Sequence, residues 1–184
     1  MRITGGTVKG YQLAKVKGLS LRPTADRVRS SIFNALGQTL ADLAVLDLFA
    51  GSGSLGIESI SRGAKRALFV DNSRGAVVLI RKNLSICGFE EVSKVIREEL
   101  PKGLTTIKNL RCGQFDLIFI DPPYGKGLIE PTITKLLENN LLAPNGTIVA
   151  ESATWANDTL PFEISNVRLE QRRIYGSTAV GFYC

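Results

Sequence analysis

Short apolar runs alternate with helical patterns along most of this chain, and that alternation limits the possible folds more than any other feature. Five runs are predicted strands, over residues 44–49, 66–70, 92–96, 115–120 and 147–150. Helical patterns lie before and between them, over 25–37, 53–62, 73–86 and 128–139. Strands that alternate with helices form a mostly parallel sheet, because each helix carries the chain back to the starting edge. Two further strands, 167–174 and 178–183, are joined by Gly176-Ser177.

Length and composition indicate one soluble globular domain. The chain has 184 residues, of which 44% are hydrophobic and 22% charged, as in a folded globular protein. No apolar run approaches the roughly 20 residues that span a bilayer, and the first residues lack the apolar core of a signal peptide. The three cysteines are isolated and the chain has no histidine, so we expect a cytoplasmic protein without a metal site. The lack of histidine also excludes Ser-His-Asp and Cys-His catalysis.

A glycine-rich loop follows the first predicted strand. Gly51, Gly53 and Gly56 have the GxGxxG spacing of dinucleotide sites, and Asp71 follows 20 residues after Gly51. Asp47 beside the loop would repel a pyrophosphate, but it suits S-adenosylmethionine, whose ammonium and sulfonium groups are cationic. Asp71 is placed to bind the ribose hydroxyls. A nicotinamide cofactor is therefore disfavoured, and a glycine turn without any ligand is the plain structural alternative.

The fourth predicted strand ends in Asp121-Pro122-Pro123-Tyr124. Two prolines fix φ and carry no N–H, so the corner continues neither a strand nor a helix. It presents a carboxylate, a carbonyl and an aromatic ring at the end of the sheet. That set suits a planar amine, because the oxygens accept its two N–H groups and the ring stacks on its face. The alternative is an ordinary proline turn.

The net charge of +6 lies in the first 30 residues. They contain seven Lys and Arg residues and one acid, whereas the rest of the chain is balanced. Such a basic segment suits a polyanion, with binding that weakens as salt rises. Alternatively, it is a solvated basic hairpin that aids solubility.

Together these residues resemble the class I S-adenosylmethionine methyltransferases that modify exocyclic amines of bases. The likeness is closer to the 16S rRNA guanine-N2 methyltransferase family and covers almost the whole chain. It is carried by Arg22–Arg29, Phe33-Asn34, Asp47–Gly53, Gly56–Glu58, Asp121–Tyr124 and Arg172–Gly176.

The resemblance implies a Rossmann-like, seven-stranded, mostly parallel sheet with helices on both faces and an antiparallel last strand. A basic β-hairpin arm, residues 1–20, would precede a methyltransferase domain, residues 21–184. The expected cofactor-binding residues are Asp47, Phe49, Ala50, Gly51, Ser52, Gly53, Gly56, Asp71, Asn72, Glu98, Glu99 and Thr24. Relatives usually offer an Asp to the adenine amine, whereas this chain has Glu98 and Glu99 after its third strand.

The implied reaction is methylation of a guanine N2 amine in 16S rRNA, within an assembled or partly assembled small subunit, by a monomer. Asp121 and the Pro122 carbonyl would hold the amine, Pro123 would stiffen the corner, and Tyr124 would stack on the flipped base. The expected RNA-binding residues are Arg2, Lys9, Arg22, Arg27, Arg172 and Arg173. Thr24 and Arg27 are alternatively a helix cap and a helix-face charge. An adenine-N6 DNA or RNA methyltransferase and a non-catalytic RNA-binding module remain as alternatives, and the sequence assigns Trp155 no role.

Overall fold

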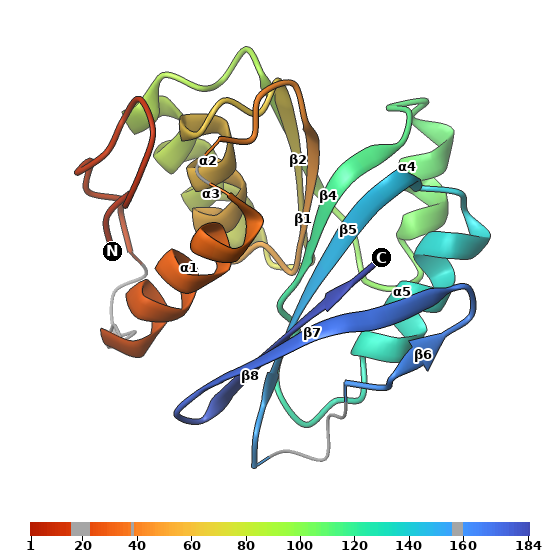
Figure 1. Ribbon diagram of the computed structural model, residues 1–184. Helices are drawn as coiled ribbons and strands as arrows, with labels where there is room; N and C mark the ends of the chain where they lie inside the picture. Colours follow the sequence, from red (N-terminus) through yellow and green to blue (C-terminus); the bar gives the residue numbers. More distant parts are fainter. Residues whose placement is uncertain (16–22, 38, 156–159) are drawn as a thin grey trace.

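The structure, a computed structural model, describes residues 1–15, 23–37, 39–155 and 160–184, and it alternates helices and strands as predicted (Figure 1). The helices are α1 (Pro23–Leu36), α2 (Ser54–Ser61), α3 (Arg74–Cys87), α4 (Leu104–Asn109) and α5 (Ile129–Glu138). The strands are β1 (Ala44–Leu48), β2 (Arg66–Asp71), β3 (Ser93–Arg97), β4 (Phe115–Ile120), β5 (Leu142–Ala153), β6 (Glu163–Ile164), β7 (Val167–Tyr175) and β8 (Thr178–Tyr183).

The strands form one sheet in the order β3-β2-β1-β4-β5-β8-β7-β6. Strands β1 to β5 are parallel to one another, and β8 runs antiparallel to both β5 and β7. The mostly parallel Rossmann-like sheet and its antiparallel last strand are therefore confirmed. The expected count of seven strands was wrong by one, because two-residue β6 also pairs with β7. Two residues are too short to show a strand periodicity.

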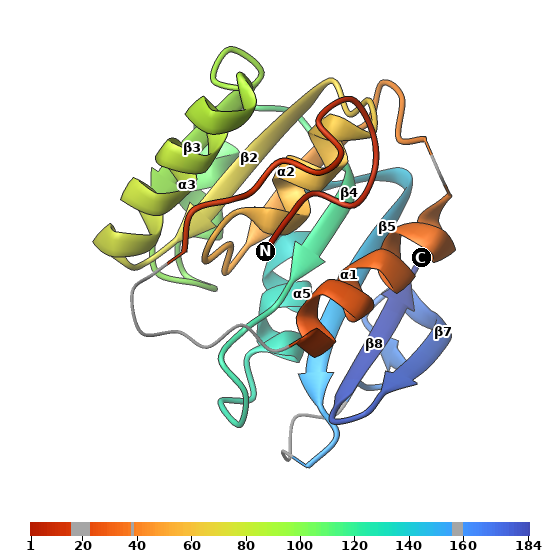
Figure 2. The same ribbon diagram turned by 90° about the vertical axis from the view of Figure 1, so that its left-hand side faces the viewer.

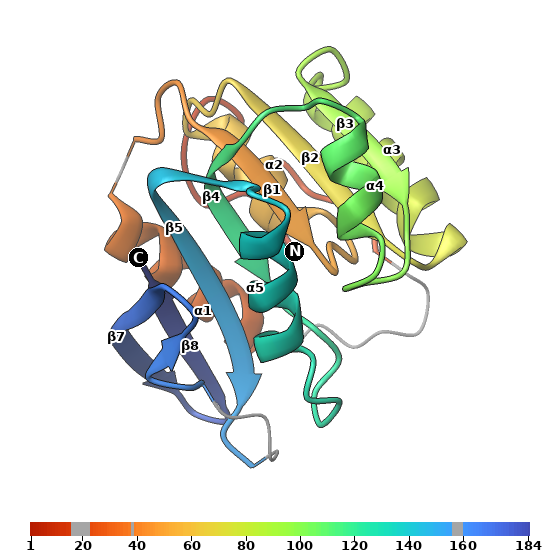
Figure 3. The ribbon, with the colours of Figure 1, turned by 90° about the vertical axis from the view of Figure 1, so that its right-hand side faces the viewer.

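Helices cover both faces of the sheet, so β1, β2, β4 and β8 are buried on both sides along most of their length. Helices α1, α2 and α3 lie on one face (Figure 2), and α4 and α5 lie on the other (Figure 3). Successive residues of a strand point to opposite faces. Accordingly Phe119 and Val149 belong to the apolar cluster on the α1 face, whereas Ile118 and Ile148 belong to the cluster on the other face.

The N-terminal segment turns back on itself and packs against α2 (Figure 2). The expected hairpin has one bridge, between Arg2 and Gln12. Ile3, Val8 and Leu13 are buried in the cluster on the α1 face, so the first residues share the main core. The predicted division of the chain after residue 20 falls on residues outside the described part and stays a prediction.

Two features of the structure were not predicted from the sequence. Helix α4 has only six residues, too few for a clear helical period. Strand β5 begins at Leu142, five residues before the predicted start, because the Pro144–Gly146 turn lies within an irregular stretch of its pairing with β4. In the described ranges, no helix is long and apolar enough to span a membrane.

Candidate active site

Acidic side chains gather where β1, β4 and β5 end. Asp47 on β1 lies beside Phe119 of β4 in the strand register, and Asp121 follows β4 directly. Asp47 is 1% exposed, and its Oδ2 accepts a hydrogen bond of 2.9 Å from the Gly56 N–H. The parallel topology thus brings the two predicted acids to one end of the sheet.

The glycine-rich loop packs tightly between β1 and α2. Gly51 and Gly53 have φ of 56° and 77°, and Phe49, which is not a glycine, has φ of 56°. Such a φ costs a non-glycine residue energy, and residues of this kind cluster at functional sites. A Cβ added at Gly56 would lie 2.3 Å from Cε1 of Phe69, so α2 can approach β2 this closely only with glycine there. The loop includes Ala50, whose N–H donates to the Val70 carbonyl.

Asp71 ties the loop to the end of β2. Its Oδ2 accepts from the Gly51 N–H and its Oδ1 from the Ser73 N–H, both at 2.9 Å. Each carboxylate oxygen keeps a lone pair for a further donor. Asp71 therefore both shapes the loop and keeps acceptors for a ligand hydroxyl.

A hollow of about 370 Å³ lies next to Asp71, and Asn72, Arg97, Glu98 and Glu99 line it. Glu98 is half-buried and its N–H donates to the Asp71 carbonyl, whereas Glu99 is exposed. Of the two glutamates, Glu98 is the one that the backbone holds against the Asp71 end of the loop. At the other end of the loop, the Ser52 carbonyl accepts from the Asn83 amide at 2.9 Å.

The Asp-Pro-Pro-Tyr corner opens into a small cavity of about 140 Å³. Asp121 and Tyr124 line it together with Met1, Val28, Arg29, Ser54, Leu55, Glu151, Ser177 and Thr178. Ser54 and Leu55 start α2, so the cavity joins the corner to the glycine-rich loop. No side chain or backbone group in the described part hydrogen-bonds to the Asp121 carboxylate, which leaves its oxygens available to a ligand.

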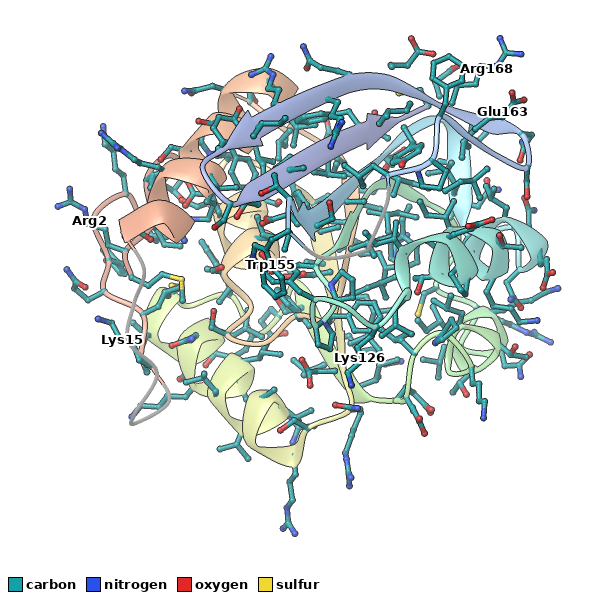
Figure 4. All side chains as sticks on the ribbon, turned by 90° about the horizontal axis from the view of Figure 1, so that it is seen from below. Arg2, Lys15, Lys126, Trp155, Glu163 and Arg168 are labelled. Carbon is teal, nitrogen blue, oxygen red and sulfur yellow. The ribbon has the colours of Figure 1, made fainter. Side chains whose placement is uncertain are left out.

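The aromatic part of the corner is open to solvent on one side. Pro122 is buried, Pro123 is exposed and Tyr124 is half-buried. The ring of Trp155 stands at 89° to that of Tyr124, with 6.2 Å between the centroids, and Trp155 is 68% exposed. Figure 4 shows Trp155 near the middle of the view onto this end of the molecule. Aromatic side chains in this position suit stacking on a base.

Burial makes the acids of the site unusually basic. The pKa of Asp47 is raised to about 8, chiefly by burial, with Asp121 and Asp71 adding to it and the Gly56 N–H opposing it. Burial raises the pKa of Asp121 to about 6. Ionised Asp47 and Asp121 would therefore be stabilised by a cation or by N–H donors.

Some of the predicted RNA-binding residues lie together and others do not. Arg2 and Arg27 line a hollow of about 570 Å³ with Thr4, Asp26, Ser30, Ser31 and Tyr175. On β7, Arg173 lies over the Phe182 ring, on the α1 face, whereas exposed Arg172 is the next residue and points to the opposite face.

Three predicted residues lie elsewhere or outside the described part. Lys9 is exposed on the N-terminal segment and does not line that hollow. Arg22 lies outside the described residues. Thr24 is in the first turn of α1, which begins at Pro23, and its side chain also falls outside the described part.

Sequence reasoning missed several residues of the cavity. Glu151 on β5 and Arg29 on α1 both line it, as do Ser177 and Thr178 at the β7–β8 turn. The sequence held one usable signal, since Glu151 is an acid that follows an apolar strand run, as Asp121 does. Within the described residues no group of three or more His, Cys, Asp or Glu side chains is placed to hold a metal ion.

Comparison with known proteins gives consistent matches over the full length. The "Putative rRNA methyltransferase YlbH" of Bacillus subtilis is 36% identical over 183 residues, covering 100% of this chain and 98% of the relative. The "Ribosomal RNA small subunit methyltransferase D" of Escherichia coli K12 is 33% identical over 191 residues, covering 100% and 89%. A solved structure described as "Putative methyltransferase yhhF from Escherichia coli" has a TM-score of 0.82 at 33% identity, with 100% and 96% covered.

These matches confirm the class I methyltransferase fold that the sequence predicted. They also confirm the resemblance, because relatives named as small-subunit rRNA methyltransferases align with the entire chain. The family described as "Conserved hypothetical protein 95" matches residues 1–184, and the chain belongs to that family.

Proposed function

We propose that this protein transfers a methyl group from S-adenosylmethionine to the exocyclic N2 amine of a guanine in small-subunit rRNA. The observation that carries the proposal is the cavity of about 140 Å³ where Asp121 and Tyr124 meet the start of α2. It combines free carboxylate acceptors, an aromatic ring and the end of a glycine-rich loop. The relatives named as rRNA methyltransferases supply the class of substrate.

The charges and shape of the glycine-rich loop fit S-adenosylmethionine. Asp47, with its pKa raised to about 8, is stabilised as a carboxylate when a cation binds nearby. The backbone of the loop would lie close to the cofactor at Phe49, Ala50, Gly51, Ser52, Gly53 and Gly56. Asp71 and Asn72 would bind the ribose, and half-buried Glu98 is better placed than exposed Glu99 for the adenine amine. Thr24 is proposed to lie over the methionine end of the cofactor.

The corner provides what a weak amine nucleophile requires. S-adenosylmethionine would supply the electrophilic methyl group of its sulfonium and leave as S-adenosylhomocysteine when the S–CH₃ bond breaks. The Asp121 carboxylate and the Pro122 carbonyl accept the two N–H groups of guanine N2, which orients the nitrogen and stabilises the positive charge that it develops. Asp121 takes the proton released by the alkylated nitrogen, in keeping with its pKa of about 6. Pro123 stiffens the corner, and Tyr124 stacks on the base.

The basic surface beside the cavity suits RNA. Arg2 and Arg27 line one hollow, and Arg173 lies on the same face of the sheet. Lys9, Arg22 and Arg172 are proposed as outer phosphate contacts. Phosphate contacts of this kind give a binding constant that falls steeply with salt. We propose that the protein is a monomer and acts in the cytoplasm. We also propose that its substrate is an assembled or partly assembled subunit, because so small a surface holds only part of an rRNA. Equal rates on protein-free rRNA would contradict that last point.

The test is transfer of a labelled methyl group to unmodified small ribosomal subunits, followed by nucleoside analysis. The expected product is N2-methylguanosine, absent with Asp121→Ala although that variant still binds S-adenosylhomocysteine. N6-methyladenosine would keep the chemistry and overturn the base. If no RNA is labelled while the cofactor binds, the substrate class is wrong.

A further inference from the structure

The cavity at the Asp-Pro-Pro-Tyr corner contains a second carboxylate. Ile120 and Ala150 are partners in the parallel register of β4 and β5. Asp121 follows Ile120, and Glu151 follows Ala150. Asp121 therefore leaves the end of β4 at the level where Glu151 lies within β5, so the two residues are side by side. Glu151 is also the register partner of Val180 on β8, whose side chain belongs to the apolar cluster on the α1 face. Glu151 accordingly faces the same side as the cavity, which it lines.

The rest of the protein makes no direct use of this carboxylate. Glu151 is half-buried, and among residues 1–15, 23–37, 39–155 and 160–184 no group forms a hydrogen bond or ion pair with its side chain. Its pKa is raised well above the ordinary value by burial and by Asp121 and Asp47, against the opposing charge of Arg29. Such a carboxylate is costly to keep without a partner. Its cost is offset when a ligand brings an N–H donor.

Arg29 lines the same cavity but does not form an ion pair or hydrogen bond with Glu151. Its Nη2 donates to the Arg2 carbonyl at 2.6 Å and to Asp26 at 3.0 Å, and its Nε lies 3.4 Å from Glu58. The guanidinium is thus held by three other groups. It moderates the negative charge at the cavity while Glu151 keeps its acceptors.

We propose that Glu151 is the residue that selects guanine, by accepting the N1–H of the target base beside the amine held at Asp121. This inference rests on the proposed function. On its Watson–Crick edge, guanine presents N1–H next to the N2 amine, whereas adenine presents a lone pair on N1 next to its N6 amine. In this arrangement the amine is held at Asp121 and Pro122, and N1 of the base, not N3 of guanine, is turned toward Glu151 on β5. Once ionised, Glu151 accepts from guanine N1–H, which lowers its raised pKa, and it repels the adenine lone pair.

The decisive probe is 2-aminopurine, which keeps the 2-amino group of guanine but has a lone pair on N1 in place of the N–H. Small subunits are reconstituted with rRNA that carries guanine or 2-aminopurine at the position found by the nucleoside analysis. The wild-type protein is expected to prefer guanine in kcat/KM by about 10- to 100-fold, the usual loss when a buried hydrogen-bonding group is left unpaired. Glu151→Gln has the same size but offers an N–H₂ donor to N1, so the preference should shrink by at least about tenfold or reverse.

A matched variant separates selection from a general loss of activity. Asp121→Asn should slow both substrates, because the 2-amino group is common to both, and it should keep or increase the preference for guanine, because removing the Asp121 charge favours ionised Glu151. If Glu151→Gln turns over too slowly, the ratio of the two dissociation constants, measured with S-adenosylhomocysteine bound, replaces the ratio of kcat/KM. An unchanged ratio in Glu151→Gln overturns the role of Glu151 while the wild-type activity on guanine stands. A wild-type protein that modifies neither substrate instead refutes the proposed function.

Discussion

Glu58 holds the N-terminal segment, α1 and α2 together, and replacing it tests how much the fold depends on one buried carboxylate. Its side chain is fully buried and accepts from the Thr4 N–H at 2.8 Å and the Thr4 hydroxyl at 2.7 Å. It also accepts from Nε and Nη2 of Arg62, at 3.1 and 2.9 Å, and lies 3.4 Å from Arg29. Both guanidinium groups are nearly buried, with 3% and 5% of their side chains exposed.

Glu58→Ala leaves two buried cations without their shared partner. Removing one member of a buried ion pair costs about 3–5 kcal/mol. A domain of this size loses about 2–4 °C in Tm for each kcal/mol, so we expect Tm to fall by about 6–20 °C. Glu58→Gln keeps the volume, and it should recover only part of the loss because the amide carries no charge. Urea unfolding followed by far-UV circular dichroism measures the change in the free energy of unfolding. A constant slope of that free energy against urea concentration shows that only stability has altered.

The matched control is Glu163→Ala, which breaks an ion pair at the surface. Glu163 and Arg168 are 3.7 Å apart, with 51% and 65% of their side chains exposed, and Figure 4 shows the pair at the rim of the molecule. Exposed pairs contribute about 0–1 kcal/mol, so this variant should unfold almost as the wild type does. If Glu58→Ala and Glu163→Ala differ by less than about 1 kcal/mol, the buried network does not hold the segment and the reasoning is wrong.

Two further predictions concern the acids of the site. Asp47→Asn should stabilise the ligand-free protein at pH 8 by a few kcal/mol, at about 1.4 kcal/mol per pKa unit, while weakening binding of S-adenosylhomocysteine. The sign follows from linkage, because the pKa of Asp47 is about 8 in the folded protein and near 4 in the unfolded chain. As pH rises from 4 to 8, ionisation of Asp47 favours the unfolded chain and the protein loses stability. The gain from Asp47→Asn should therefore be small at pH 4. Thermal unfolding and calorimetry across pH check both parts, and an equal gain at pH 4 and pH 8 would refute the linkage. Separately, single-turnover methyl transfer should fall as pH drops through about 6, because protonated Asp121 neither stabilises the positive charge on the amine nor takes its proton; a flat profile between pH 5 and 8 would count against that role.

Much of the site was predictable because its signals are local in the sequence. Asp47, Asp71 and Asp121 each sit at or just after a strongly apolar strand, and parallel strands bring such ends to one edge. The spacing of Gly51 and Gly53 likewise identified the loop, and both have the positive φ that makes glycine favourable. No such local pattern marks β6, which has two residues, or α4, which has six.

The remaining features depend on contacts between distant residues. Thr4 and Glu58 are 54 positions apart, and nothing in the sequence near Thr4 shows that the N-terminal segment packs against α2. Glu151 ends an apolar run, but its place beside Asp121 depends on the register of β4 with β5. Trp155 follows the same strand, and only the structure shows that its ring stands edge to face with Tyr124.

The three carboxylates at this end of the sheet also decide between the cofactors that a glycine-rich loop can bind. Burial raises the pKa of Asp47, Asp121 and Glu151, Asp121 further raises the pKa of the other two, and Asp47 further raises that of Glu151. Arg29 is the basic side chain lining the cavity, and it is already held by Asp26 and Glu58. A pyrophosphate would add negative charge here and push all three pKa values higher. A sulfonium, an ammonium and the N–H groups of a guanine would each lower them, which is why the electrostatics favour methyl transfer over dinucleotide chemistry.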